Sequence, residues 1–313
     1  MIFINFLRNY WMWFLLAFTV IFVLYFIFRR IYNLLRIGVS EVLSIQKPEI
    51  RKHSLIMSDC FSLSANYQVD INKNKLIIFV HDFFNSKADF KFYIDYFQKI
   101  GYNFLAFDLR YHHNEVANKK VTLGSNIKDL VTIINLFNNK YPHQQIYLLG
   151  QGLGANIISC LSNKAQVTGI ILLNIISNPN YLDSDLKTKF ISLYGFWFDR
   201  NVKLPVVLVE KLISKNKPYQ LQIKKYFENK PFLLWYRLQM NSLINKSYWK
   251  LKSSNKKVLL LQSNNHPFGN QKKIKKLMWA HLLYFIDDAH DLLWSKNYEQ
   301  YCKMIHQWIE NSS

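Results

Sequence analysis

The chain has 313 residues, of which 50% are hydrophobic and 19% are charged. This composition excludes a disordered or collagen-like protein and allows one large globular domain or two small ones with a sizeable core. Forty Lys and Arg against twenty Asp and Glu give a formal net charge of +20. Such a balance favours anionic partners, but it does not distinguish lipid head groups from nucleic acid or acidic proteins.

The N-terminal segment contains a long uncharged apolar run. Residues 10–28 are nineteen consecutive uncharged residues, enough to cross a hydrocarbon core as a helix. The run ends at Arg29 and Arg30, not at the small residues typical of a signal-peptide cleavage site. More basic residues follow the run than precede it, so the positive-inside rule places the remainder in the cytoplasm. We therefore predict a single-pass anchor over residues 1–36 in the cell membrane and a cytoplasmic domain over 37–313 that faces an anionic leaflet.

After the anchor, short apolar runs alternate with helical patterns, which predicts a mostly parallel α/β sheet covered by helices. Each run is almost continuously apolar, as strands buried on both faces must be. The expected strands are 76–80, 103–108, 145–149, 167–174, 258–262 and 282–286. Helical periodicity marks 127–137 and 298–309. Residues 176–254 break the alternation with basic and aromatic sequence, which indicates a helical cap inserted over the C-terminal edge of the sheet.

Four segments of this domain match the motifs of one family. A glycine-rich turn, Leu149-Gly150-Gln151-Gly152-Leu153-Gly154-Ala155, joins an expected strand to an apolar helix, which is the setting of a nucleophile elbow. The other three segments are Phe79-Val80-His81-Asp82, the strand that ends in Asp108 and Arg110, and Asp287-Asp288-Ala289-His290. Over roughly residue 53 to the C-terminus the chain resembles the α/β-hydrolase family, especially its bacterial membrane-anchored, lysophospholipase-like or serine-aminopeptidase-like members. The resemblance implies an α/β-hydrolase fold.

The chain departs from that family at the residues that would carry the chemistry. Gly152 stands where the family has its nucleophilic serine, and His266 stands at the position of the acid. Asp82 replaces the glycine of the oxyanion turn, and its carboxylate would oppose negative charge on a substrate oxygen. Of the triad, His290 alone matches. Three substitutions together indicate that serine-hydrolase activity has been lost.

We therefore expect a catalytically inactive, membrane-anchored α/β-hydrolase-fold protein that acts as a binding or assembly module and needs no cofactor. Its expected partners are an anionic leaflet and either another protein or a lipid or acyl ligand. The alternative is an active membrane-associated esterase or lysophospholipase-like hydrolase with a non-standard site, in which His290 serves as the base for a water.

Three further interpretations use the same residues. Gly150-x-Gly152-x-x-Ala155 fits a dinucleotide fingerprint, but such a turn follows the first strand of its unit, and the next strand here ends in Asn174 instead of an acid. His266 and His290 could bind zinc if the family alignment makes them neighbours, although no short ligand spacing accompanies them. Basic runs such as 272–276 attract phosphate. No nucleic-acid motif accompanies these runs, so a leaflet-facing surface is favoured and no nucleic acid is expected.

Overall fold

The structure is a computed structural model. It describes residues 2–35, 48–59, 61–82, 85–110, 123–161, 166–177, 234–264, 266, 269–277, 281–288 and 290–312, without the side chains of 2–9, 12, 29–35, 123 and 234–242. Most of the predicted cap, residues 178–233, lies outside the described residues.

The central feature is a nine-stranded sheet in the order β1-β2-β3-β5-β4-β6-β7-β8-β9. The six strands β4 to β9 are parallel to one another. Strand β3 pairs antiparallel with β5, β2 pairs antiparallel with β3, and β1 pairs antiparallel with β2. The strands are β1 (Glu49–Arg51), β2 (Ser54–Ile56), β3 (Ser62–Gln68), β4 (Lys75–Val80), β5 (Asn103–Phe107), β6 (Gln145–Gln151), β7 (Gly169–Leu173), β8 (Lys257–Ser263) and β9 (Leu282–Ile286). All six predicted strands are present.

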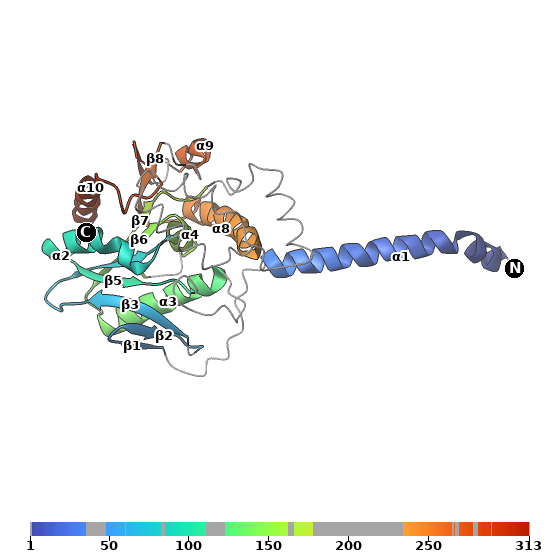
Figure 1. Ribbon diagram of the computed structural model, residues 1–313, viewed down its shortest axis with the longest axis horizontal. Helices are drawn as coiled ribbons and strands as arrows, with labels where there is room; N and C mark the ends of the chain where they lie inside the picture. The colour runs from blue at the N-terminus through green and yellow to red at the C-terminus, as the bar shows by residue number, and fades with distance from the viewer. Residues whose placement is uncertain are drawn as a thin grey trace.

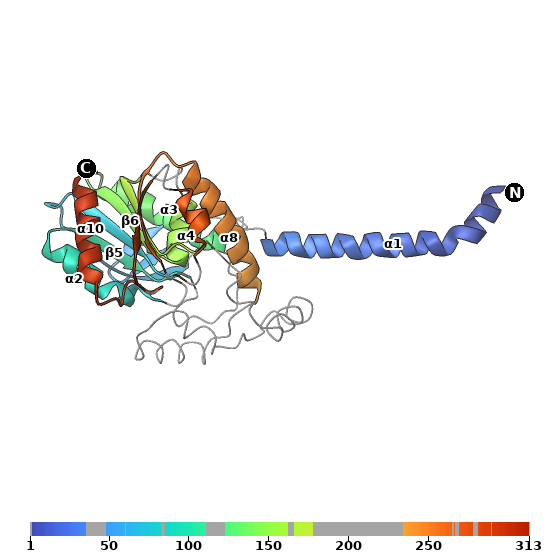
Figure 2. The same ribbon diagram turned by 90° about the horizontal axis from the view of Figure 1, so that it is seen from above.

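Helices cover both faces of the sheet (Figures 1 and 2). One face carries α3 (Leu123–Lys140), α4 (Leu153–Ser159) and α8 (Leu234–Lys252), and the other carries α2 (Lys91–Lys99) and α10 (Tyr298–Glu310). The short helices are η1 (Lys87–Phe90) and α9 (Gln271–Lys275). The predicted helical patterns at 127–137 and 298–309 are therefore confirmed as α3 and α10.

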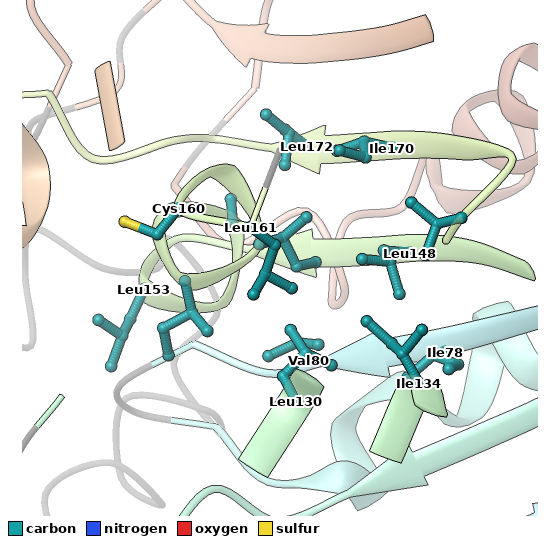
Figure 3. Packing of buried hydrophobic residues seen from close by; sticks show 14 of the residues in the cluster. Ile78, Val80, Leu130, Ile134, Leu148, Leu153, Cys160, Leu161, Ile170 and Leu172 are labelled. Atoms are coloured by element: carbon teal, nitrogen blue, oxygen red, sulfur yellow. The ribbon is translucent and has the colours of Figure 1, made fainter. Parts of the chain in front are cut away.

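Side-chain alternation along the strands divides the core into two layers. Ile78 and Val80 of β4 pack toward α3 and α4, where Leu130 and Ile134 meet them (Figure 3). Their neighbour Phe79 packs on the opposite face with α2 and α10. Because β4 is buried on both faces, its run must be apolar throughout, as the sequence pattern required.

The N-terminal helix α1 (Ile2–Leu35) extends away from the sheet domain (Figures 1 and 2). It exposes large apolar side chains, among them Trp13 (67% exposed), Phe18 (70%) and Ile21 (65%). Counting the residues that the structure describes, no helix is long and apolar enough to cross a membrane. The expected transmembrane helix is thus not found among these residues, and the anchor stays a prediction of the sequence.

Candidate functional site

The turn between β6 and α4 has the backbone of a sharp strand-to-helix elbow. Gly152 has φ 52° and ψ −113°, a region in which side chains other than glycine are strained. Its N–H donates to the carbonyl of Leu173 at 3.0 Å, which ties the turn to β7. A Cβ at Gly154 would lie 2.0 Å from the carbonyl oxygen of Val80, so α4 approaches β4 too closely for any side chain there. The glycines of the motif therefore serve the local geometry of the elbow.

The carboxylate of Asp82 lies in the space beside Gly152. Asp82 is the second residue after β4, and its Oδ1 accepts a hydrogen bond from the backbone N–H of Leu153 at 2.6 Å. A Cβ built on Gly152 would lie 2.2 Å from the carboxylate carbon and from both oxygens. The side chain of Asp82 is almost completely buried. Asp82 thus occupies the volume that a side chain at position 152 would take.

His290 and His266 form a buried series of hydrogen bonds with Asp82. Nε2 of His290 lies 2.7 Å from Oδ2 of Asp82, and Nδ1 of His290 lies 2.8 Å from Nε2 of His266. Both imidazole rings are buried, with 1% and 5% exposure respectively. Burial lowers the pKa of His266 well below its ordinary value, and the proximity of His290 lowers it further. His266 is therefore neutral near pH 7 and supplies no negative charge at the position of the acid.

The hydrogen bonds among Asp82, His290 and His266 restrict where the protons of the two imidazole rings can lie. With Asp82 ionised, Nε2–H of His290 donates to the carboxylate. A neutral His266 carries one ring N–H and one lone pair, so it either donates to a neutral His290 or accepts from a protonated one. In both states both ring nitrogens of His290 are engaged. While the hydrogen bonds from His290 to Asp82 and His266 are intact, no ring nitrogen of His290 can accept a proton from water.

The same geometry does not support the zinc alternative. Two imidazole nitrogens bound tetrahedrally to one zinc ion, at about 2.0–2.1 Å each, would be about 3.3 Å apart. The facing nitrogens of His266 and His290 are 2.8 Å apart and bond to each other. Within the described ranges, no group of three or more His, Cys, Asp or Glu side chains is placed to hold a metal ion.

Asn174 and Asp291, which no motif in the sequence assigns to the site, hold it together. Asn174, at the end of β7 with φ 47°, donates through Nδ2 to the carbonyl of His290 at 2.6 Å and accepts from the N–H of Ser263 at 2.6 Å. The buried carboxylate of Asp291 accepts from Nε2 of Gln151 at 3.0 Å. Their signal in the sequence was slight: a polar residue at the end of an apolar strand, and an acid beside the family's histidine.

His81 fixes the turn that carries Asp82. Its Nε2 accepts from the backbone N–H of Leu109 at 2.8 Å, and its Nδ1 lies 2.6 Å from the carbonyl oxygen of Asp82. A backbone N–H can only donate, so the proton of the ring is on Nδ1 and donates to Asp82. Burial lowers the pKa of His81, in agreement with this neutral form. The structure thus brings together all four predicted site residues, and their supporting contacts come from residues at or just after the ends of β4 to β9.

Comparison with known proteins gives the fold and little more. No family model matches the chain. Protein phosphatase methylesterase 1 of Candida albicans is 26% identical over 132 residues, which span 41% of this chain and 36% of that protein. The chain therefore matches only about a third of the length of this relative.

Solved structures of esterases and lipases superpose on most of the chain. A monoacylglycerol lipase of Paleococcus ferrophilus matches with a TM-score of 0.64 at 14% identity, over 81% of this chain and all of that one. A monoglyceride lipase of Saccharomyces cerevisiae gives 0.62 at 11% identity, over 88% and 97% of the two chains. A carboxylesterase of Nitrososphaera gargenis gives 0.57 at 17%, over 80% and 96%. Taken with the sheet order and the elbow, these similarities show that the chain has an α/β-hydrolase fold.

Proposed function

We propose that this chain is an α/β-hydrolase-fold protein without serine-hydrolase activity, which acts as a binding or assembly module at a membrane. One observation carries the proposal: the carboxylate of Asp82 lies against Gly152 and accepts the N–H of Leu153. In α/β-hydrolases position 152 corresponds to the nucleophile, and the following N–H belongs to the oxyanion hole.

This arrangement removes two requirements of acyl transfer at once. Position 152 offers no hydroxyl or thiol to attack an acyl carbon. The N–H that would stabilise the tetrahedral oxyanion is bonded to a negative group, which repels the charge that develops there. Loss of the nucleophile alone costs roughly a millionfold in rate in a serine protease.

The buried Asp82–His290 pair keeps the alternative open as a second candidate function. An active esterase-like or lysophospholipase-like enzyme would use His290 as the base for a water. For this, Nε2 of His290 must leave Oδ2 of Asp82, from which it is 2.7 Å away. Such an enzyme would lose all turnover when His290 is replaced.

The membrane part of the proposal rests on α1. Apart from the hydroxyl groups of Tyr10, Thr19 and Tyr25, its described side chains between Tyr10 and Phe28 are apolar and mostly exposed, and water is a poor solvent for so large an apolar surface. The uncharged run over 10–28 ends in two arginines, as expected of a helix that anchors a domain on the cytoplasmic side.

Ester hydrolysis by designed variants tests the catalytic part. We expect no turnover of nitrophenyl esters by the natural chain, by Gly152→Ser, or by Gly152→Ser with His266→Asp. Turnover is expected, if at all, only in the triple variant Gly152→Ser, His266→Asp, Asp82→Gly. Only that variant has the nucleophile, the acid and the free oxyanion N–H together. Turnover by the natural chain that His290→Ala abolishes would contradict the proposal and support the alternative enzyme.

Gentle solubilisation tests the binding part. A stoichiometric protein that co-purifies with the chain would support an assembly role, and a bound acyl lipid would support a lipid-binding role. A chain that purifies with neither, from membranes in which it is abundant, would contradict both.

A further inference from the structure

Helices α8 and α9 belong to a segment that is strongly basic. Residues 234–286 contain ten Lys and Arg and no Asp or Glu. By contrast, α2 and α10 together carry three lysines and the three acidic residues Asp95, Glu299 and Glu310. This segment of 53 residues therefore carries +10 of the net charge of +20, more than a uniform excess of lysine would place there.

Exposed side chains of α8 and α9 make up what we call the α8–α9 surface, and the two helices meet where Nζ of Lys273 lies 4.8 Å from the ring centre of Tyr248. Its described members are Lys246, Trp249, Lys252, Lys272, Lys275 and Lys276, all exposed. Trp249 is 66% exposed, and Nζ of Lys252 lies 5.7 Å from the centre of its ring. An exposed tryptophan among lysines is costly in water but suits a lipid head-group region, where the ring and the ammonium groups both find partners.

The position of α8 connects this surface with the N-terminal helix. The C-terminal end of α1 lies beside α8, and α8 is on the side of the domain from which α1 extends (Figures 1 and 2). Helices α2 and α10 lie at the opposite end of the domain (Figure 1). If α1 enters a bilayer, α8 is closer to the lipid surface than α2 and α10 are.

We propose that the α8–α9 surface docks on anionic phospholipid head groups and orients the domain on the leaflet. The inference rests on the proposed anchoring by α1. Lysines near an anionic leaflet contribute on the order of 1 kcal/mol each, about fivefold in binding, and salt screens them. Continuity with α1 and the exposed Trp249 favour a lipid surface over RNA as the partner.

The test uses the full chain in lipid nanodiscs with a cysteine reporter. Ser253→Cys, in a Cys60→Ser background, places a thiol at the exposed end of α8, while Cys160 and Cys302 are buried. Gln300→Cys on α10 is the matched reporter at the opposite end of the domain. We expect a water-soluble maleimide to react more slowly at position 253 in phosphatidylserine-containing discs than in phosphatidylcholine discs, and equally fast at position 300.

Charge reversal tests the same contact with a matched control. Lys246→Glu with Lys252→Glu removes two contacts, which lowers the ratio of docked to undocked domain by about 25-fold or more and abolishes the protection. Lys91→Glu with Lys99→Glu makes the same change in net charge on the far helix α2 and should leave the protection intact.

Each failure has a different meaning. A chain that does not enter nanodiscs at all overturns the anchoring and this docking with it. A chain that enters them but shows equal reactivity at position 253 in both lipids overturns the docking alone. Protection of position 253 by polyuridylate in neutral discs, as strong as that by phosphatidylserine, would assign the surface to RNA instead.

Discussion

Asp82 and Gly152 share one volume at the ends of β4 and β6. The glycine leaves the space that the carboxylate fills, and the carboxylate occupies the N–H that would otherwise face a substrate. Neither residue can change alone without a steric conflict or an unsatisfied buried group. The two substitutions relative to the family pattern are therefore parts of one arrangement.

Gly152→Ala should lower the free energy of unfolding, because its Cβ would overlap Asp82 and its φ is unfavourable for alanine. Overpacking of this kind typically costs 1–3 kcal/mol. Asp82→Gly in the same chain should restore part of the loss, which urea unfolding of the two single variants and the double variant would measure as a coupling. Gly101→Ala is the control, since φ there is +92° but, apart from its chain neighbours, no atom of the described residues lies within 4 Å of a Cβ built there. Equal losses with and without Asp82 would contradict the shared volume.

The neutral His266 makes stability depend on pH. Its pKa is well below the ordinary value of 6.5 in the folded chain, so below about pH 6.5 the unfolded chain binds the additional proton. Stability should therefore fall as the pH decreases through this range. His266→Gln cannot protonate and should make the decrease shallower in urea unfolding at pH 7.5, 6.5 and 5.5.

The decrease should not vanish in that variant, because burial also lowers the pKa of His81 and of His281. A slope unchanged by His266→Gln would contradict the assignment of His266 as a buried neutral base.

At the scale of elements, Arg110 links three segments at the end of β5. It pairs with Asp59 before β3 at 2.5 Å and with Asp129 of α3 at 2.5 Å, and its guanidinium lies 4.4 Å from the ring centre of Phe61. Burial raises the pKa of Asp129, and Arg110 opposes that rise. The carboxylate of Asp129 is therefore tolerated in the core because the guanidinium accompanies it.

Arg110→Ala should destabilise the domain by about 3–5 kcal/mol, the usual result of leaving a buried charge without its partner. Thermal and urea unfolding would measure the loss. Arg51→Ala is the control, because its ion pair with Glu49 is about half exposed and such pairs contribute less than about 1 kcal/mol. If Asp129→Asn added to Arg110→Ala recovers none of the stability, the uncompensated carboxylate is not the cause.

The sequence predicted the buried elements well and the exposed ones poorly. Strands β4 to β9 are apolar runs because both of their faces are covered, so their positions follow from hydrophobicity alone. Strands β1 to β3 escaped prediction because they are short or polar, and β3 alternates exposed serine with buried leucine and alanine. Their pairing depends on partners elsewhere in the chain, which local pattern does not contain.

At the site, the sequence predicted which residues take part but not the direction of the Asp82 side chain. Motifs in the sequence identified Gly152, Asp82, His266 and His290 as its members. The sequence pattern predicts that Asp82 faces an oxyanion, whereas in the structure its carboxylate lies against Gly152 and is hydrogen-bonded to His290 as well. The direction of that side chain depends on the approach of β4, β6 and the segment after β9, which is a property of the tertiary fold.

The molecule as a whole combines a polar-surfaced α/β domain with a helix whose side chains are apolar on every described side. Helix α1 packs none of its described large side chains into the core of the domain. Such an apolar surface is unfavourable in water, and the anchoring proposed above would remove it from water. The proposed orientation follows from the charges that flank the apolar run.

We expect the full chain to remain in the membrane fraction after extraction with alkaline carbonate, because an apolar helix in lipid resists high pH and salt that release electrostatically bound proteins. A chain that begins at residue 48 should be released by salt, since only its basic surface would hold it. If the proposed orientation holds, protease added to intact cells or protoplasts should spare the domain and should digest it after lysis, because the positive-inside rule favours the cytoplasmic side for residues 37–313. An N-terminal helix in which residues 10–28 are replaced by an alternating Glu-Lys sequence is the control for expression and folding. Digestion of the domain without lysis would reverse the orientation, and release of the full chain by carbonate would remove the anchor.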